Sequence, residues 1–463
     1  MDETAVARKS EYGKPNEVLD IDAVANSIND LPEAILEHIL SFVPMEDAVR
    51  TCVLSKNWRY LWTSYPNLEL VEWAFSRREQ FTNFVDRVLV LQSSSRIKRL
   101  VLSCRDLGDA SRVNLWVSTA VKRNVEDFTV HLSIIPGNFI LPHCLFSSAT
   151  LTRLNLCILG ALKLPSPIWF PNLKVLHLEY ITFVDKRSTE QLLSSPVLEE
   201  LTLRYCTWDN LETLTIRTPM LKILTIHDED FDCPYDCSSV HPDGCRVLIY
   251  GINLESIVCI SPFLNDYQIE KSCSLLHADI DVPDCCPRRT EQVAYRLNKQ
   301  LEGMHSIERL TLSSKAVDVL SSAAELHLHL PVFPKLKELN FGRLNLKHQV
   351  IVKLLHNSPN LEKLYFHEGI ELCPSDDEDG ATLDPVPHCF GSHLRQIELS
   401  DILLWEKEVR VLEPLLKHAV VLEKFMLRSL WDPSLWRAAE MFREKLLEIR
   451  CGSKSLETVI FWP

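Results

Sequence analysis

The sequence repeats one short apolar pattern along most of its length. In each copy, two apolar residues lie three positions apart and a third follows two positions later. Copies of the pattern begin at Ile97, Val125, Leu151, Leu173, Leu198, Leu221, Ile307, Leu336, Leu361, Leu394, Leu422 and Leu456. The alternation at the end of each copy predicts a short strand with one apolar face. One such strand cannot bury its apolar side chains alone, so the copies must stack around a common core.

The spacing of the copies indicates which kind of stack they form. From Ile97 to Leu221 the first positions lie 22 to 28 residues apart, mostly within the roughly 20–29 residue period of leucine-rich repeats. Weaker copies at Leu254 and around Ala278 occupy the gap before Ile307. Five copies carry a proline two residues before the first apolar residue, at Pro171, Pro196, Pro219, Pro334 and Pro359. Because proline ends a helix and is tolerated where a strand begins, these prolines support the register. The sequence therefore predicts an α/β solenoid, with a curved parallel sheet and outer helices.

Residues that alternate with the buried leucines should face outward from the curved sheet, where repeat proteins bind their partners. Their mixture of polar and aromatic types fits the recognition of another protein. The candidate contact residues are Asn155, His177, Thr202, Thr225, Asn340, Tyr365 and Glu398.

A compact apolar block precedes the repeats and follows a polar tail. Pro32 suits the first turn of a helix and Pro44 ends it. At about 100° per residue, the apolar side chains of this helix cover roughly half of its circumference. These side chains are Ile35, Leu36, Ile39, Leu40, Phe42 and Val43. We expect two further short helices, Met45–Cys52 and Lys56–Trp62. The surplus apolar surface predicts either a partner protein or packing of the block as a cap on the solenoid.

The order and spacing of four motifs in this block resemble an F-box. The motifs are Leu31-Pro32, Ile39-Leu40-Ser41-Phe42, Val53-Leu54-Ser55-Lys56 and Trp58-Arg59-Tyr60-Leu61-Trp62, with departures at Cys52 and Asn57. The resemblance implies a three-helix module that binds the small adaptor subunit linking F-box proteins to a cullin. By family analogy the contacts fall on Leu31, Pro32, Ile35, Leu36, Ile39, Leu40, Val53, Leu54, Trp58 and Trp62. The sequence does not separate these contacts from the module's own core.

The C-terminal region resembles an FBD domain, which accompanies F-box and repeat modules in a large plant-type family. The resemblance rests on Pro387-His388-Cys389-Phe390, on Leu394–Leu399 and on Leu415–Lys424. We therefore expect a flexible tail over 1–26, an F-box over 27–70, leucine-rich repeats over 80–382 and an FBD-like region over 383–463 that continues the solenoid.

Composition narrows the classes of partner and compartment. The net charge of −14 argues against nucleic acid or an anionic membrane as the main partner. The start of the chain lacks the apolar core of a secretory signal, and no apolar run approaches the roughly 18 residues of a membrane span. The 15 cysteines are scattered through apolar stretches. Together these features predict reduced thiols in a cytoplasmic or nuclear protein.

Candidate catalytic and metal-binding motifs are weak. Cys233, Cys237, His241 and Cys245 are spaced evenly by four, whereas zinc sites usually contain a Cys-x2-Cys pair. We interpret this segment, the Cys285-Cys286 pair and the acidic run Ser375–Gly380 as connecting loops. The sequence contains no phosphate-binding glycine loop, nucleophile elbow or HExxH motif. We therefore expect neither an enzyme nor a cofactor.

The resemblance and the repeat together imply a substrate-recruiting subunit of a cullin-type ubiquitin ligase. The F-box would bind the adaptor and the curved sheet an unidentified target protein. Two alternatives remain: a scaffold that binds the adaptor without ligase activity, and a receptor whose target binding depends on a small ligand.

Overall fold

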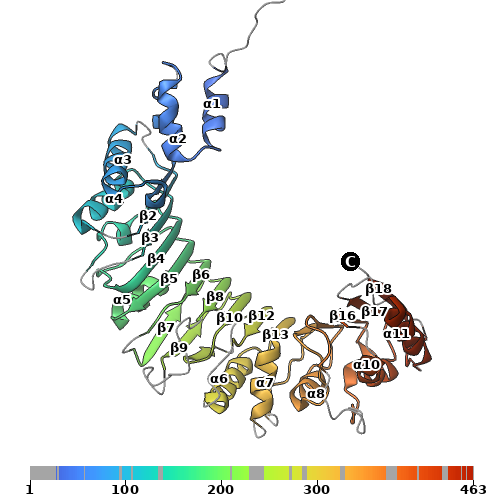
Figure 1. Ribbon diagram of the computed structural model, residues 1–463. Helices are drawn as coiled ribbons and strands as arrows, with labels where there is room; N and C mark the ends of the chain where they lie inside the picture. Colours follow the sequence, from blue (N-terminus) through green and yellow to red (C-terminus); the bar gives the residue numbers. More distant parts are fainter. Residues whose placement is uncertain are drawn as a thin grey trace, which may run out of the picture.

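The computed structural model shows a chain curved into an open arc, with the helical N-terminal block at one end (Figure 1). It describes residues 28, 31–56, 58–92, 96–105, 108–133, 139–208, 211–228, 244–270, 274–283, 289–323, 329–371, 383–403, 406–429, 436–449, 451–454 and 456–461.

A parallel sheet of 15 described strands lines the inner side of the arc (Figure 1). In spatial order the strands are β1 (Asn67–Val71), β2 (Arg99–Cys104), β3 (Asp127–Leu132), β4 (Arg153–Leu162), β5 (Val175–Phe183), β6 (Glu200–Arg204), β8 (Ile223–His227), β10 (Ser256–Ile260), β12 (His277–Asp281), β13 (Arg309–Leu312), β14 (Glu338–Phe341), β15 (Lys363–Phe366), β16 (Gln396–Ile402), β17 (Lys424–Ser429) and β18 (Glu457–Phe461). The second and third apolar residues of a copy lie on its strand, as Leu154 and Leu156 do on β4, and both are buried. The predicted leucine-rich-repeat fold is confirmed.

The two weak copies of the repeat form regular strands. Strand β10 pairs with β8 on one side and with β12 on the other, and β12 pairs with β13. Their inward side chains Ile257, Ala278 and Ile280 are buried. The sheet therefore runs without interruption through the part of the chain where the sequence pattern is least regular.

The outer layer consists mainly of helices, as predicted. They are α3 (Arg78–Leu91), α4 (Ala110–Lys122), α5 (Lys186–Leu193), α6 (Thr290–Glu302), α7 (Ser314–Ser322), α8 (Gln349–His356), α9 (His388–Ser392), α10 (Glu406–His418) and α11 (Trp436–Glu448), with a 3₁₀ turn η5 (Leu145–Ser147). Side-chain caps begin several of these helices: Asp185 accepts from the backbone N–H of Ser188 at the start of α5 (2.8 Å).

Between α5 and α6, strands replace helices in the outer layer. A second parallel sheet has the order β11 (Asp266–Ile269), β9 (Arg246–Tyr250), β7 (Thr213–Arg217). The alternating apolar residues Leu214 and Ile216, and Val247 and Ile249, face the core and are buried. Their period of two favours strands over helices, although we expected helices or turns here.

The N-terminal block contains α1 (Glu33–Leu40) and α2 (Met45–Arg50), followed by 3₁₀ turns η2 (Thr51–Val53) and η3 (Leu61–Ser64) and, beyond β1, η4 (Glu72–Ala74). Turns and η3 occupy the place of the third expected helix. A helix of about two turns is marginal alone, and here Trp58 is buried from a turn and Trp62 from η3. Ser64 of η3 donates to Glu37 of α1 (3.0 Å), which joins the two ends of the block.

Within the described residues, none of the helices combines the length and apolar character needed to cross a membrane.

Candidate functional site

The F-box residues predicted from the sequence divide into a buried and an exposed set. Leu36, Leu40, Trp58 and Trp62 are buried and pack in the core that continues into the repeats. Ile39 is half-buried against the same core. These side chains hold the module together and attach it to the solenoid, and the four buried ones do not reach its surface.

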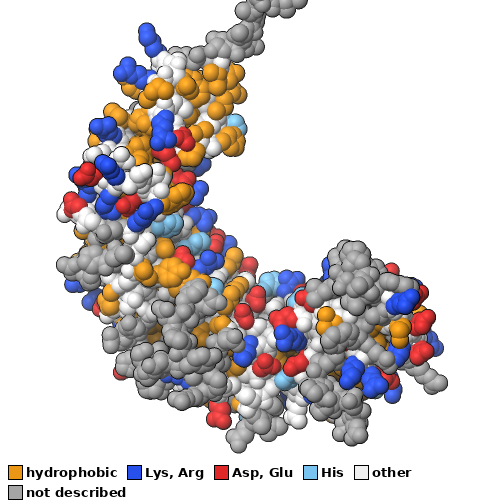
Figure 2. Space-filling view, viewed as in Figure 1, with side chains coloured by type: hydrophobic (Ala, Val, Ile, Leu, Met, Phe, Trp, Pro, Cys, Tyr) orange, Lys and Arg blue, Asp and Glu red, His pale blue; other side chains and the backbone are white. Residues whose placement is uncertain are grey.

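The remaining predicted contacts lie on the surface of the module. Leu31, Pro32 and Ile35 are exposed on and before α1, and Val53 and Leu54 are exposed by 84% and 62% at and after η2. Exposed apolar side chains are common one at a time, but a contiguous patch marks an interaction site. Figure 2 shows hydrophobic side chains gathered over α1 and α2 at the tip of the arc.

Three further apolar residues of this module are exposed and were not among the predicted contacts: Ile28, Phe42 and Tyr60. Phe42 follows α1 and its ring packs edge-on against His38, with ring centroids 4.9 Å apart. The broad apolar arc of the helix already included Phe42, so the sequence carried a signal for it. We name the set Ile28, Leu31, Ile35, Phe42, Val53 and Leu54 the F-box apolar surface.

The seven candidate contact residues of the repeats fall in a single row across the sheet. The strand register aligns Asn155, His177, Thr202 and Thr225, and separately Asn340, Tyr365 and Glu398. Val258, Asp279 and Thr311 complete the row between these two groups. Val258 and Asp279 belong to the two weak copies, whereas Thr311 lies between Leu310 and Leu312 of a clear copy and was not among the predicted residues. We name the ten residues the central row.

Hydrogen bonds between neighbouring strands hold side chains of the central row in place. The side-chain amide of Asn155 donates to Thr129 on the preceding strand (3.0 Å). Asn340 donates to Thr311 on its own preceding strand in the same way (3.1 Å). His177 lies 2.9 Å from Glu200. Thr202 and Asn340 are buried, whereas the other five predicted residues are partly accessible. The central row is thus an ordered surface, and Thr202 and Asn340 contribute little accessible area to it.

Aromatic and acidic side chains distinguish different parts of the concave face. Tyr180 and Tyr205 stack with ring centroids 4.8 Å apart, and His227 lies 4.8 Å from Tyr205. Further along, Asp279 and Asp281 both lie on β12. Burial raises the pKa of Asp279, and the charge of Asp281 adds to that effect. The face therefore offers aromatic contacts in one part and negative charge in another.

A polar cluster is enclosed where β8 ends. Tyr267, Asn265 and Ser261 all donate hydrogen bonds to Oδ2 of Asp228, those of Asn265 and Ser261 at 3.4 and 3.3 Å. Burial raises the pKa of Asp228 to about 6, although the three hydrogen bonds favour its charged form. All three donors are neutral side chains, so their hydrogen bonds stabilise the carboxylate less than its removal from water destabilises it.

The buried cysteines among the described residues provide no activated thiolate. All of them are free, and burial raises the pKa of Cys104 and of Cys206 to about 12. Cys245 is buried and its pKa is raised to about 11, again chiefly by burial. Protonated thiols of this kind are poor nucleophiles and poor metal ligands. Cys233, Cys237 and His241, the Cys285-Cys286 pair and the run Ser375–Gly380 lie outside the described residues.

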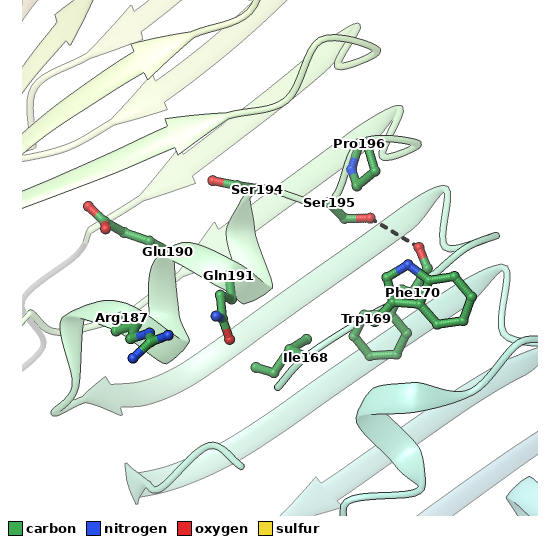
Figure 3. A pocket seen from close by; sticks show the side chains of 9 residues that line it. All are labelled: Ile168, Trp169, Phe170, Arg187, Glu190, Gln191, Ser194, Ser195 and Pro196. Atoms are coloured by element: carbon green, nitrogen blue, oxygen red, sulfur yellow. Dashed lines mark hydrogen bonds between the residues drawn. The ribbon is translucent and has the colours of Figure 1, made fainter. Parts of the chain in front are cut away.

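A shallow cavity of about 430 Å³ lies on the outer layer beside α5 (Figure 3). Ile168, Trp169 and Phe170 form one wall, and Arg187 and Glu190 of α5 lie on the other. Ser195 donates to the backbone oxygen of Phe170 (3.4 Å) across its floor. These residues do not bring a nucleophile and a base together as acyl-transfer or hydrolytic chemistry requires.

Comparison with known proteins identifies the modules. An F-box domain family matches residues 28–70, and a second family, described as FBD-associated F-box protein At5g56370, LRR repeats, matches residues 113–235.

Similar proteins that match most of this chain come from Arabidopsis thaliana. F-box/LRR-repeat protein At4g14096 is 30% identical over 88% of this chain and 89% of its own length. F-box protein At3g59000 is 33% identical over 78% of this chain and 76% of its own length. Putative F-box/FBD/LRR-repeat protein At3g59240 is 30% identical, over 76% and 71% respectively. Proteins of this type generally act as substrate adaptors in ubiquitin ligases rather than as enzymes. With its F-box, its stacked repeats and these relatives, the chain belongs to the F-box/LRR-repeat family.

Proposed function

We propose that this chain is the substrate-recruiting subunit of an SCF-type cullin-RING ubiquitin ligase. The F-box apolar surface binds the adaptor subunit, and through it the cullin, while the central row and its neighbours bind a target protein. The chain itself performs no chemistry and uses no cofactor. The proposed division is a tail over 1–26, an F-box over 27–70, repeats over 80–382 and an FBD-like region over 383–463. A cytoplasmic or nuclear location is part of the proposal, supported by the free thiols of every described cysteine.

The observation that carries this proposal is the F-box apolar surface. Its side chains remain in water although Leu36, Trp58 and Trp62 of the same small module are buried. Leaving large apolar side chains exposed forgoes about 1.5–3 kcal/mol for each that could be buried. A partner that covers them recovers this free energy on binding, which supports a docking role for the module.

The arrangement of the two surfaces supports recruitment by proximity. The F-box lies at one end of the arc and the concave sheet extends away from it (Figure 1). A target held on that sheet is fixed relative to whatever binds the F-box. Such tethering raises the effective concentration of target lysines near an activated ubiquitin carrier, so the subunit needs no catalytic group.

Adaptor binding is tested with a double substitution at Leu31 of the F-box apolar surface and at the adjacent exposed Pro32. The full chain is co-expressed with an SCF adaptor, and the wild type is compared with Leu31→Ala, Pro32→Ala in a pull-down. We expect the variant to recover less adaptor, because both side chains are exposed where α1 begins. Equal recovery by a folded variant would remove this part of α1 from the docking surface.

A reconstituted ubiquitination assay separates the proposal from its two alternatives. Targets are first identified by affinity purification and mass spectrometry with the wild-type chain. Ubiquitin transfer to a captured protein supports recruitment. Adaptor binding with no transfer to any captured protein favours a scaffold. Capture that disappears after gel filtration and returns with a small-molecule fraction favours a ligand-dependent receptor.

A further inference from the structure

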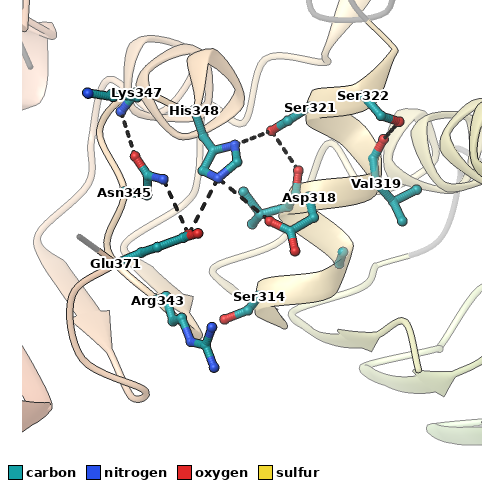
Figure 4. Close-up of polar contacts among 12 residues, drawn as sticks. Ser314, Asp318, Val319, Ser321, Ser322, Arg343, Asn345, Lys347, His348 and Glu371 are labelled. Atoms are coloured by element: carbon teal, nitrogen blue, oxygen red, sulfur yellow. Dashed lines mark hydrogen bonds and ion pairs between the residues drawn. The ribbon is translucent and has the colours of Figure 1, made fainter. Parts of the chain in front are cut away.

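Three potential metal ligands, one from each of three successive C-terminal repeats, meet where the strands lead into the outer layer (Figure 4). Asp318 comes from α7, His348 precedes α8 as its N-cap, and Glu371 follows β15. The Nε2 atom of His348 lies 3.6 Å from Asp318 Oδ1 and 3.7 Å from Glu371 Oε2. The three ligand atoms all lie within 4.8 Å of one another.

These separations do not describe ordinary hydrogen bonds. An N–H···O bond places its heavy atoms about 2.7–3.2 Å apart, and both contacts of His348 Nε2 exceed that range. The nitrogen instead lies at nearly equal distances from two carboxylate oxygens, so a single N–H is at best shared between them in a long three-centre contact. A metal ion between the three atoms would use all of them at once.

The two separations that involve His348 Nε2 are close to those of a tetrahedral site. With metal–ligand bonds of about 2.0–2.1 Å, neighbouring ligands of Zn²⁺ lie roughly 3.3–3.4 Å apart. The observed 3.6 and 3.7 Å require a contraction of only a few tenths of an ångström. Asp318 and Glu371 are exposed side chains and can move by that amount.

Hydrogen bonds around the cluster already orient two of the ligands. Ser321 Oγ lies 3.0 Å from Nδ1 of His348, so the other ring nitrogen is directed at the carboxylates. Asn345 donates to Glu371 Oε2 (3.3 Å) and accepts from the backbone N–H of Lys347 (3.0 Å). Metal-binding histidines almost always carry such a partner on the second nitrogen, and ligating carboxylates are commonly hydrogen-bonded as well.

We propose that Asp318, His348 and Glu371 form a binding site for one divalent transition-metal ion, with Zn²⁺ the best match. Imidazole nitrogen favours zinc and its neighbours over Mg²⁺ and Ca²⁺, which prefer all-oxygen sites. Two carboxylates balance the double positive charge. Half-buried His348 leaves solvent access for a water as fourth ligand. The site is independent of the proposed ligase function.

A bound ion would cross-link neighbouring repeats. Its ligands belong to three successive repeat units, built around β13, β14 and β15. In a solenoid each repeat contacts mainly its neighbours, so a bond across three units resists their separation. The ion would therefore stiffen the C-terminal half of the arc.

Metal uptake by the full chain tests the proposal. Protein co-purified with its adaptor is stripped with a chelator, freed of chelator and titrated with Co²⁺ and Zn²⁺. We expect the wild type to bind one more ion than His348→Ala. The additional Co²⁺ should show weak visible bands without a thiolate charge-transfer band, which separates it from any ion held by cysteines. His305→Ala, which removes an exposed imidazole elsewhere, serves as the matched control and should retain the ion.

Two more conservative variants keep the proposal testable if His348→Ala does not fold. Asp318→Asn keeps the shape of an exposed side chain and should weaken binding by more than the roughly 10- to 100-fold that loss of a ligand's hydrogen-bond partner costs, because it removes a charged ligand. Ser321→Ala leaves all three ligands and should weaken it by about 10-fold. Zn²⁺ should also raise the melting temperature of the wild type and not that of Asp318→Asn. Equal uptake by the wild type, His348→Ala and Asp318→Asn would overturn the proposal and leave the cluster as an ion-pair network.

Discussion

Replacing two exposed residues of the F-box apolar surface should separate adaptor binding from folding. We consider the double variant Val53→Ala, Leu54→Ala, since these side chains are exposed by 84% and 62%. Neither belongs to the buried core of the module. Exposed substitutions of this kind usually change the free energy of unfolding by no more than about 0.5 kcal/mol. The variant should therefore fold as the wild type does.

The expected loss of affinity follows from the area that the adaptor would cover. Each CH₂ or CH₃ group that becomes buried contributes about 0.8 kcal/mol. Val53→Ala removes two such groups and Leu54→Ala three. Scaled by their present exposure, the losses are about 1.3 and about 1.5 kcal/mol. Together they weaken binding by about 100-fold, since about 1.4 kcal/mol corresponds to a factor of ten.

Calorimetric titration of the purified chain with the adaptor measures this effect directly. The matched control is Val90→Ala, Leu115→Ala, which removes the same groups from side chains exposed by 77% and 61% on α3 and α4. The control should bind as tightly as the wild type. If the two double variants bind the adaptor with equal affinity while both remain folded, the adaptor does not dock where we place it.

Two further predictions concern stability. Trp58→Ala should lower the free energy of unfolding by about 3–5 kcal/mol, because the indole is only 2% exposed and packs in the continuous core. Urea denaturation measures this change. A loss below about 1 kcal/mol would show that the F-box core contributes little to the stability of the chain. The pKa of Asp228 is raised to about 6, above its usual value of 3.8, so the folded state holds this proton more tightly than the unfolded state. The contribution of Asp228 to the free energy of unfolding should consequently fall, on the order of 2 kcal/mol, as pH rises from about 4 to 6. Asp228→Asn should flatten that part of the profile, and an unchanged slope would contradict the assignment.

The repeat region was the most predictable part of the molecule. Leu154 and Leu156 on β4 recur with equivalents on the neighbouring strands, and a strand that buries alternate side chains has few ways to stack with its copies. The same pattern predicted that His177 and Tyr365 face outward, and the strand register then showed that they share one row. The repeat pattern did not predict the outer strands β7, β9 and β11. A short apolar alternation between two repeats does not indicate whether the segment joins the inner sheet or the outer layer.

The contact residues of the candidate F-box site were less predictable from the sequence than the repeats were. Motif spacing identified the module, but Leu36 and Ile35 are neighbours on one broad apolar arc and the sequence treats them alike. Only the packing of α1 against η3 and the neighbouring core decides that Leu36 is buried and Ile35 is exposed. The Asp318, His348 and Glu371 cluster was likewise invisible, because its members are 30 and 23 residues apart and share no motif.

The sequence by itself determined the type of fold, the direction of the sheet and the modular order, since periodicity and local motifs act between residues that are near in the chain. The tertiary structure decided which apolar side chains stay in water, how the central row aligns, and which polar groups meet from separate repeats. These properties depend on contacts between distant segments, and such contacts form only when the repeats have stacked.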